Sequence, residues 1–125
     1  MEHHQPAAVA ADHPDFRRVL WTGEHSQLVI MTIQPGEAIG AETHDHNDQI
    51  LAFTSGTGEA VIAGETRPVG PGDVVAVPAG THHDFRNTGD EPLVLTTVYA
   101  PPEHPDGTIH ATKAEADAAE EAEGH

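Results

Sequence analysis

The chain has 125 residues, the size of one domain, with 5 Lys and Arg residues against 21 Asp and Glu residues and a formal net charge of −16. This charge argues against a protein that binds the phosphates of a nucleic acid. The chain has no Cys, which excludes disulfides, Cys-ligated metals and a thiol nucleophile, so any bound metal has nitrogen and oxygen ligands. It has no apolar run of transmembrane length and no signal-peptide pattern, so we expect a cytoplasmic protein without a membrane partner.

The two ends differ in composition from the middle. Residues 1–15 are small and polar, and we expect a flexible N-terminal arm. Residues 111–125 are mostly Ala and acidic residues, and Thr112 and Glu115 have the spacing of a helix capping box. Because so short a helix is marginal in water without a partner, a solvated acidic tail is the expectation and a docked helix the alternative. Residues 16–110 remain as the folded domain.

The sequence pattern in the middle of the chain predicts short strands. Of 24 Leu, Ile, Val and Phe residues, 22 lie between Phe16 and Tyr99, and Gly- and Pro-containing turns separate them. Short β-branched runs at intervals of this kind predict an all-β barrel or sandwich, and no stretch shows the apolar period of a helix. The predicted strands cover residues 16–22, 28–33, 49–53, 60–63, 74–77 and 93–99.

Four of the eleven histidines stand beside turns in two groups. The first group holds His44 and His46, and the second holds His82 and His83. Alternate residues of a strand face the same side, so Glu42 with His44, or His44 with His46, can point at one site, to which the second group adds a ligand. The other seven lie in polar or terminal contexts and are expected to be exposed: His3, His4, His13, His25, His104, His110 and His125.

The second group lies in a pattern that resembles the cupin superfamily. The second cupin motif, G(X)5PXG(X)2H(X)3N, is matched at all five positions, by Gly72, Pro78, Gly80, His83 and Asn87. In this motif we expect Asn87 to fix turn or backbone geometry. His82 is the neighbour that faces away, because adjacent strand residues point to opposite faces.

The first cupin motif, G(X)5HXH(X)3,4E(X)6G, is matched with departures. Counting back from Gly56 puts Gln49 where the motif has its glutamate. A four-residue gap then puts His44 on the second histidine and Glu42 on the first. The register with His44 and His46 as the pair leaves only two residues before Gln49, so we prefer Glu42 and keep His46 as its alternative.

The resemblance implies a double-stranded β-helix, the cupin jelly roll, with a metal site in the barrel mouth and a homodimeric assembly. The implied metal ligands are Glu42, His44, Gln49 and His83. Two imidazoles and a carboxylate with open positions suit one divalent transition metal, Fe or Mn first and then Ni, Zn or Cu. A neutral Gln49 in place of glutamate weakens metal binding and removes a carboxylate base. A scaffold that has lost its metal is the alternative.

Strand alternation also predicts the pocket walls. Alternate residues counted from Gln49 and from His83 place Leu51, Phe53 and Phe85 on the inward face. Tyr99 joins them if its side chain faces inward from its own strand. Of these, Phe53 and Phe85 are more typical of a hydrophobic core than of a substrate-binding wall. The resulting pocket is small and apolar, with few polar groups, and fits a small organic molecule.

Two functions follow from this resemblance. The first is a metal-dependent enzyme, either dioxygenase-type or a Lewis-acid isomerase or lyase, acting on a small molecule. The second is a non-catalytic module that binds a small ligand or a metal, which the glutamine at position 49 favours. The fold alone does not choose between them, because one scaffold hosts catalysts and binders alike.

The acidic composition makes a prediction of its own. Adding NaCl from about 0.05 to about 1 M should raise the melting temperature, because salt screens repulsion among the carboxylates. A melting temperature that stays flat across this range would show that charge repulsion does not limit stability.

Overall fold

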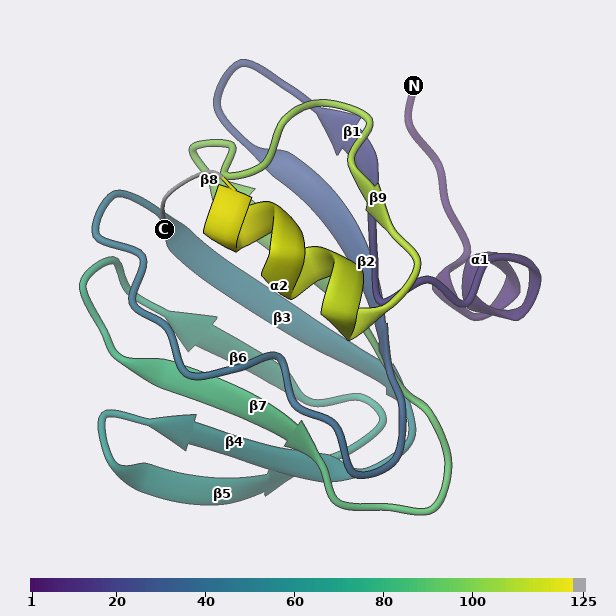
Figure 1. Ribbon diagram of the computed structural model, residues 1–125, viewed down its shortest axis with the longest axis vertical. Coiled ribbons are helices and arrows are strands. Elements are labelled where there is room, and N and C mark those ends of the chain that lie inside the picture. The colour runs from purple at the N-terminus through teal and green to yellow at the C-terminus, as the bar shows by residue number, and fades with distance from the viewer. Residues whose placement is uncertain (123–125) are drawn as a thin grey trace.

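The computed structural model describes residues 1–122, which form nine strands and two helices (Figure 1). In chain order these are α1 (Pro6–Asp12), β1 (Arg17–Thr22), β2 (Gln27–Ile33), β3 (Asp48–Ser55), β4 (Gly58–Ile62), β5 (Glu65–Val69), β6 (Val74–Val77), β7 (His83–Asn87), β8 (Leu93–Ala100), β9 (Ile109–His110) and α2 (Lys113–Ala122). Among the described residues, no helix has both the length and the apolar character needed to span a membrane.

The strands form two antiparallel sheets. The larger has the order β6-β3-β8-β2-β1-β9 and the smaller the order β5-β4-β7. Isolated bridges from Ala38 to Arg86 and from Glu42 to His83 add the segment between β2 and β3 to the free edge of β7. Figure 1 shows the two sheets with α2 in front of them and α1 at the side. The predicted all-β double-stranded β-helix is confirmed.

The predicted strand segments correspond to β1, β2, β3, β4, β6 and β8. Strand β5 was not predicted because its sequence, Glu-Thr-Arg-Pro-Val, is polar and exposed at four of five positions. Strand β7, with the sequence His-Asp-Phe-Arg-Asn, has one apolar residue and was seen only through its motif. Strand β9 has two residues, too few for a sequence pattern. Pairing with neighbours, rather than local propensity, forms these three strands.

The hydrophobic core lies between the sheets. Its largest members are fully buried and come from both sheets, so the apolar side chains of one sheet cover those of the other. This main cluster includes Leu51, Phe53, Phe85, Leu95 and Tyr99, and Phe53 and Phe85 contact each other with ring centroids 5.9 Å apart. The core therefore holds rigid the strands that carry His83 and Gln49.

Both ends of the chain pack more closely than the sequence suggested. The arm at residues 1–15 contains α1, whose Ala10 is buried against Ile30 and Val94 on the outer face of the larger sheet. The solvated-tail expectation for residues 111–125 is wrong as far as residue 122, because α2 forms and buries Ala116 in the main core. Residues 123–125 lie outside the described part of the chain.

The predicted capping box starts α2. The Glu115 amide donates to Thr112 Oγ1 at 3.1 Å, and the Glu115 carboxylate accepts from the Ala111 amide. These bonds satisfy helix-start donors that would otherwise lack partners. Contact of Ala116 with the core then supplies the partner that an isolated helix of ten residues lacks.

Gly56 supports the turn between β3 and β4 and gives a test of the packing. Its φ is +82°, and an added Cβ would collide with the Pro92 carbonyl oxygen. Gly56→Ala should lower the free energy of unfolding by more than about 1 kcal/mol. Gly64→Ala is the matched control, because its φ is +84° and nothing lies within 4 Å of the added Cβ. Equal losses in chemical denaturation would contradict the close approach at Gly56.

Candidate metal centre

A backbone bridge brings the two sequence motifs together. The Glu42 amide donates to the His83 carbonyl at 2.9 Å, and the His83 amide donates to the Glu42 carbonyl at 2.9 Å. Such an exchange of both bonds between directly opposed residues is the pairing of antiparallel strands. It sets Glu42 beside His83 independently of either side chain.

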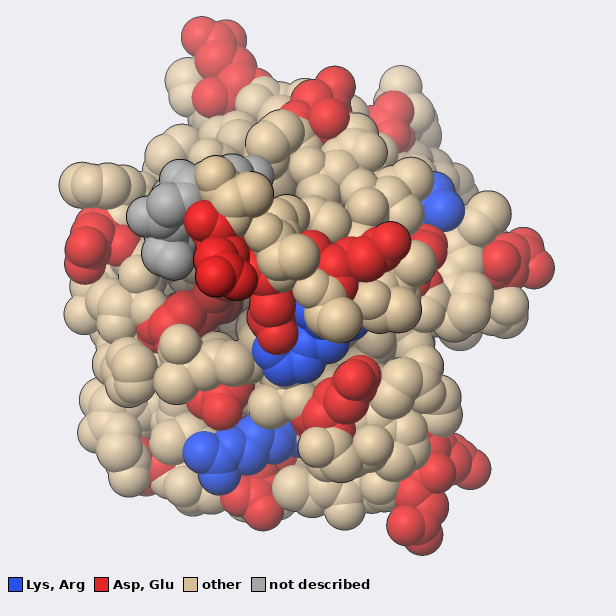
Figure 2. All heavy atoms as spheres, viewed as in Figure 1, with Lys and Arg blue, Asp and Glu red and all other residues tan. Residues whose placement is uncertain are grey.

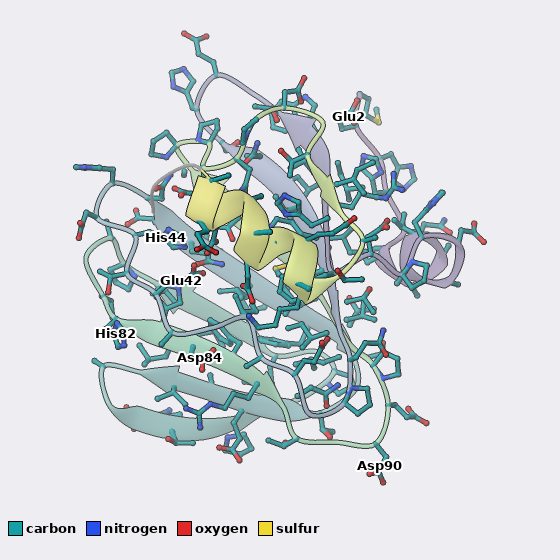
Figure 3. All side chains as sticks on the ribbon, in the orientation of Figure 1. Glu2, Glu42, His44, His82, Asp84 and Asp90 are labelled. Carbon is teal, nitrogen blue, oxygen red and sulfur yellow. The ribbon has the colours of Figure 1, made fainter. Side chains whose placement is uncertain are left out.

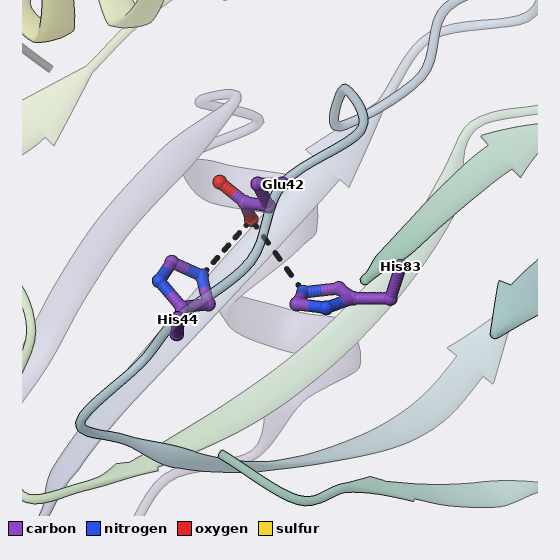
Figure 4. A group of neighbouring side chains, drawn as sticks. All are labelled: Glu42, His44 and His83. Atoms are coloured by element: carbon purple, nitrogen blue, oxygen red, sulfur yellow. Dashed lines mark ion pairs between the residues drawn. The ribbon is translucent and has the colours of Figure 1, made fainter. Parts of the chain in front are cut away.

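Three side chains converge at this bridge. Glu42 Oε1 lies 3.1 Å from His44 Nε2 and 3.9 Å from His83 Nε2. One ligand atom from each of Glu42, His44 and His83 lies within 4.8 Å of the others, close enough to hold one metal ion. Figure 4 shows both imidazole rings directed toward the Glu42 carboxylate. His83 is 2% exposed, and the Glu42 and His44 side chains are 21% and 12% exposed.

The His83 ring is oriented for metal binding. Its Nδ1 lies 2.8 Å from the Thr81 carbonyl oxygen. Because a carbonyl only accepts, Nδ1 carries the hydrogen in this contact, which leaves the lone pair of the neutral ring on Nε2. Nε2 is buried and has no hydrogen-bond partner among the described residues. A backbone acceptor on the second nitrogen is the usual support of a metal-bound histidine.

The His44 ring lies among acidic groups. Burial alone would lower the pKa of His44, but the hydrogen bond and charge of Glu42, with the charges of Glu103 and Glu120, outweigh it and raise the pKa. His44 Nδ1 lies 3.6 Å from Glu103 Oε1, on the side of the ring opposite Glu42. In the absence of a metal, these carboxylates favour the protonated ring.

Gln49 is tied into the core beside the triad. It is 1% exposed, and its Nε2 donates to Thr97 Oγ1 at 3.0 Å and to the Tyr99 hydroxyl at 3.3 Å. The Tyr99 ring in turn meets the His44 ring edge-on, with centroids 5.6 Å apart. Gln49 Oε1 is buried and has no hydrogen-bond partner among the described residues, so it is the one amide atom available to a ligand.

The remaining motif residues take separate places. His46 is exposed and outside the triad, while Glu42, its competitor for the same role, lies inside it. His82 faces away and lies 3.0 Å from Thr43 Oγ1 through Nδ1, and Figure 3 places it apart from Glu42 and His44. The predicted backbone role of Asn87 is confirmed, because its Nδ2 donates to the Ile33 and Glu91 carbonyls at 2.8 Å.

The cavity beside the triad differs from the predicted apolar pocket. It has a volume of about 470 Å³, and among the described residues its lining is Ala41, Glu42, Thr43, His44, Glu103, His104 and Glu120. The four predicted walls, Leu51, Phe53, Phe85 and Tyr99, lie instead in the main core. Alternation did turn these side chains inward, but in a barrel this small they fill the space between the sheets.

Sequence reasoning missed Glu103, His104 and Glu120. His104 was expected to be exposed, but its Nε2 is buried and its ring meets the Tyr99 ring edge-on, with centroids 5.2 Å apart. Gln27 is fully buried and holds this segment, accepting from the Glu103 and His104 amides at 3.2 and 2.9 Å and donating to the His104 carbonyl at 2.7 Å. Gln27, which directly precedes the predicted apolar strand at residues 28–33, was the one signal available.

Burial of His104 predicts a specific pH dependence. Burial, followed by the charges of Arg17, His110 and His44, lowers the pKa of His104 to about 3. Between the unfolded value near 6.5 and this one, the unfolded chain binds a proton that the folded chain does not. His104 therefore destabilises the fold progressively as pH falls from about 6.5 toward 3.

The His104→Gln variant should reduce this dependence. The slope of unfolding free energy against pH should fall by up to about 1.4 kcal/mol per pH unit in this window. His25→Gln is the control, because the His25 side chain is 89% exposed. Urea titrations between pH 4 and 7 measure both slopes. A His104 variant with the wild-type slope would show that the ring is not held neutral.

The chain is similar to several known proteins. The uncharacterized protein YrkC of Bacillus subtilis is 46% identical over 85% of this chain, which spans 60% of the length of YrkC. The crystal structure of BH2720 from Bacillus halodurans is 42% identical, with a TM-score of 0.89, over 93% of this chain and 92% of that one. A 5-nitrosalicylic acid 1,2-dioxygenase of Bradyrhizobium sp. is 35% identical over 54% of this chain and 32% of its own length. The Cupin domain family matches residues 29–99, and the chain therefore belongs to the cupins.

Proposed function

We propose that this cupin binds one divalent transition metal through Glu42, His44 and His83 and acts as a metal-dependent enzyme on a small organic molecule. The observation that carries the proposal is the convergence of the three ligand atoms within 4.8 Å of one another. Two imidazoles and one carboxylate on one side of a metal leave other positions open for a substrate.

The residues fit a metal in three respects. His83 Nε2 and Gln49 Oε1 are buried polar atoms without hydrogen-bond partners among the described residues, which is costly unless a ligand satisfies them. The rings of His83 and His44 have their second nitrogens near the Thr81 carbonyl and the Glu103 carboxylate. The donors are nitrogen and oxygen, which suit Fe or Mn first and then Ni, Zn or Cu.

The surrounding residues supply what the enzyme proposal needs. Glu42, His44 and His83 would hold the metal, which would supply oxygen chemistry if it is redox-active and Lewis-acid chemistry if it is not. Glu103 and Glu120 line the cavity, and the proposal gives them the role of accepting a proton from a bound molecule. The apolar core seals the site from below, since Tyr99 and Phe85 are at most 1% exposed.

The proposal covers both a dioxygenase-type enzyme and a Lewis-acid isomerase or lyase. Dioxygenase-type chemistry has a precedent in the similarity to the 5-nitrosalicylic acid 1,2-dioxygenase, which covers 54% of this chain. A Lewis-acid isomerase or lyase uses the same ligands with a carboxylate base. The identity of the metal chooses between them. Three further statements remain predictions: the protein is cytoplasmic, it forms a homodimer, and its folded domain is bounded at residues 15 and 110.

A non-catalytic binding module is the second candidate, and Gln49 favours it. At this position the cupin motif has a glutamate, whereas the Gln49 amide is neutral and its Nε2 is engaged by Thr97 and Tyr99. The site therefore lacks the carboxylate that could serve as a base from that position. Turnover of any small substrate by the metal-loaded protein would decide for the enzyme.

Two neighbouring histidines provide the test of metal binding. Untagged His83→Ala should lose the metal that wild type carries in a near 1:1 ratio, because it removes one of two imidazole ligands. His82→Ala is the matched control, since His82 is the adjacent residue and lies outside the triad. Elemental analysis by mass spectrometry measures the metal in each protein.

The result that contradicts the proposal is equally clear. Wild type without bound metal after incubation with Fe, Mn, Ni, Zn and Cu would overturn it, as would equal metal in both variants. Circular dichroism and the melting temperature of metal-free His83→Ala separate metal loss from misfolding. A folded variant without metal is the expected result.

A further inference from the structure

We propose that the cavity selects a small organic molecule bearing a positively charged amine, which Glu103 and Glu120 contact while its other end reaches the metal. This inference rests on the proposed function, because it names the class of ligand for the same site.

The cavity lining is acidic on three sides. Three of its seven described lining residues are glutamates, and none is Lys or Arg. Glu42 precedes β3, Glu103 follows β8 and Glu120 belongs to α2, so three separate parts of the chain contribute. Figure 2 shows acidic side chains gathered around α2 on this face of the molecule.

The three carboxylates act at the same place. All three line the same cavity, and Glu42 Oε1 and Glu103 Oε1 lie 3.1 Å and 3.6 Å from the two ring nitrogens of His44. If Glu42 is used by the metal, Glu103 and Glu120 are the other two carboxylates among the described lining residues. A divalent metal with one carboxylate ligand has a net charge of +1, which two further carboxylates exceed.

Glu103 is held in position rather than free to turn away. The fully buried Gln27 accepts from its amide at 3.2 Å and fixes the next residue by two more hydrogen bonds. Glu103 Oε1 lies 3.6 Å from His44 Nδ1, at the rim of the triad. Because the fold fixes its backbone in advance, Glu103 loses less conformational entropy when its carboxylate binds a cation.

A buried polar atom of His83 lies beside the acidic lining and lacks a hydrogen-bond partner among the described residues. His83 is 2% exposed, and its unpartnered Nε2 points at Glu42, which lines the cavity. The acidic lining therefore adjoins a built polar site and differs in this from the acidic groups spread over the rest of the surface.

The charge of Arg17 acts on Tyr99 and His104 beside this site, but Arg17 does not line the cavity. Arg17 is 2% exposed, and its Nη1 lies 3.2 Å from His110 Nδ1. Lys113 Nζ donates to the Asp117 carboxylate at 3.0 Å. Neither residue lines the cavity, so a carboxylate or phosphate ligand would meet like charges there. An ammonium group would meet opposite charges.

Three probes of similar size and different charge test the inference: benzylamine, benzyl alcohol and benzoate. Isothermal titration calorimetry measures their affinities for wild type, Glu103→Gln/Glu120→Gln and the control Glu24→Gln/Glu121→Gln. The control removes the same charge from two residues outside the cavity lining. Metal content is measured for each protein, and the titrations are repeated on metal-free protein.

Wild type should bind benzylamine at least about tenfold more tightly than benzoate, because each exposed carboxylate contributes about fivefold to binding of a cation. The cavity variant should lose about tenfold or more in benzylamine affinity when the two proteins are compared at the same metal content. The control should stay within about twofold of wild type. Raising NaCl from about 50 to about 500 mM should weaken benzylamine binding to wild type.

Four results would overturn the inference. The first two are benzoate binding as tightly as benzylamine, and no benzylamine binding by wild type. The others are an equal loss of benzylamine affinity in the control and the cavity variant, and two metal equivalents in wild type that fall to one in the cavity variant. The last result would make Glu103 and Glu120 ligands of a second metal ion. A wild type without metal whose metal-free form still prefers benzylamine would contradict the proposed function alone.

Discussion

The pair of backbone hydrogen bonds between Glu42 and His83 is the constraint on which the site depends. Each is 2.9 Å long, and together they fasten the segment before β3 to the start of β7. Side chains on a flexible segment would pay an entropic cost to meet at a metal. Here the backbone hydrogen bonds already hold the two segments together, so the Glu42 carboxylate and the His83 ring converge without that cost. His44, two residues from Glu42, completes the group.

Polar and apolar roles are separated along the same strands. Leu51, Phe53 and Phe85 fill the space between the sheets, while Gln49 and His83, two residues from Leu51 and Phe85, lie at the mouth. The chain after β8 then closes this mouth with the Gln27-bound segment and α2. Their glutamates make the cavity acidic, whereas its floor is the hydrophobic core. The fold thus supplies rigidity from the barrel and charge from its C-terminal segments.

The sequence alone predicted the convergence but not its surroundings. Motif spacing identified Glu42, His44 and His83 because ladder pairing fixes which residues of adjacent strands face each other. The second motif also identified Asn87, whose side chain binds the Ile33 and Glu91 carbonyls. Glu103 and His104 were missed because a loop carries no periodic pattern, and their placement depends on the distant Gln27. Glu120 was missed because propensity alone leaves a ten-residue helix marginal, and only burial of Ala116 in the core decides that α2 docks.

X-ray absorption spectroscopy of the metal-loaded protein tests the central claim most directly, because it reports the atoms bound to the metal. The account predicts one metal per chain with nitrogen and oxygen neighbours at about 2.0–2.2 Å and the outer-shell scattering of two imidazole rings. With Zn or Mn in place, His83→Ala should remove one ring from that pattern or abolish loading. A metal surrounded by oxygen alone, with no imidazole scattering, would contradict the assignment of Glu42, His44 and His83 as its ligands.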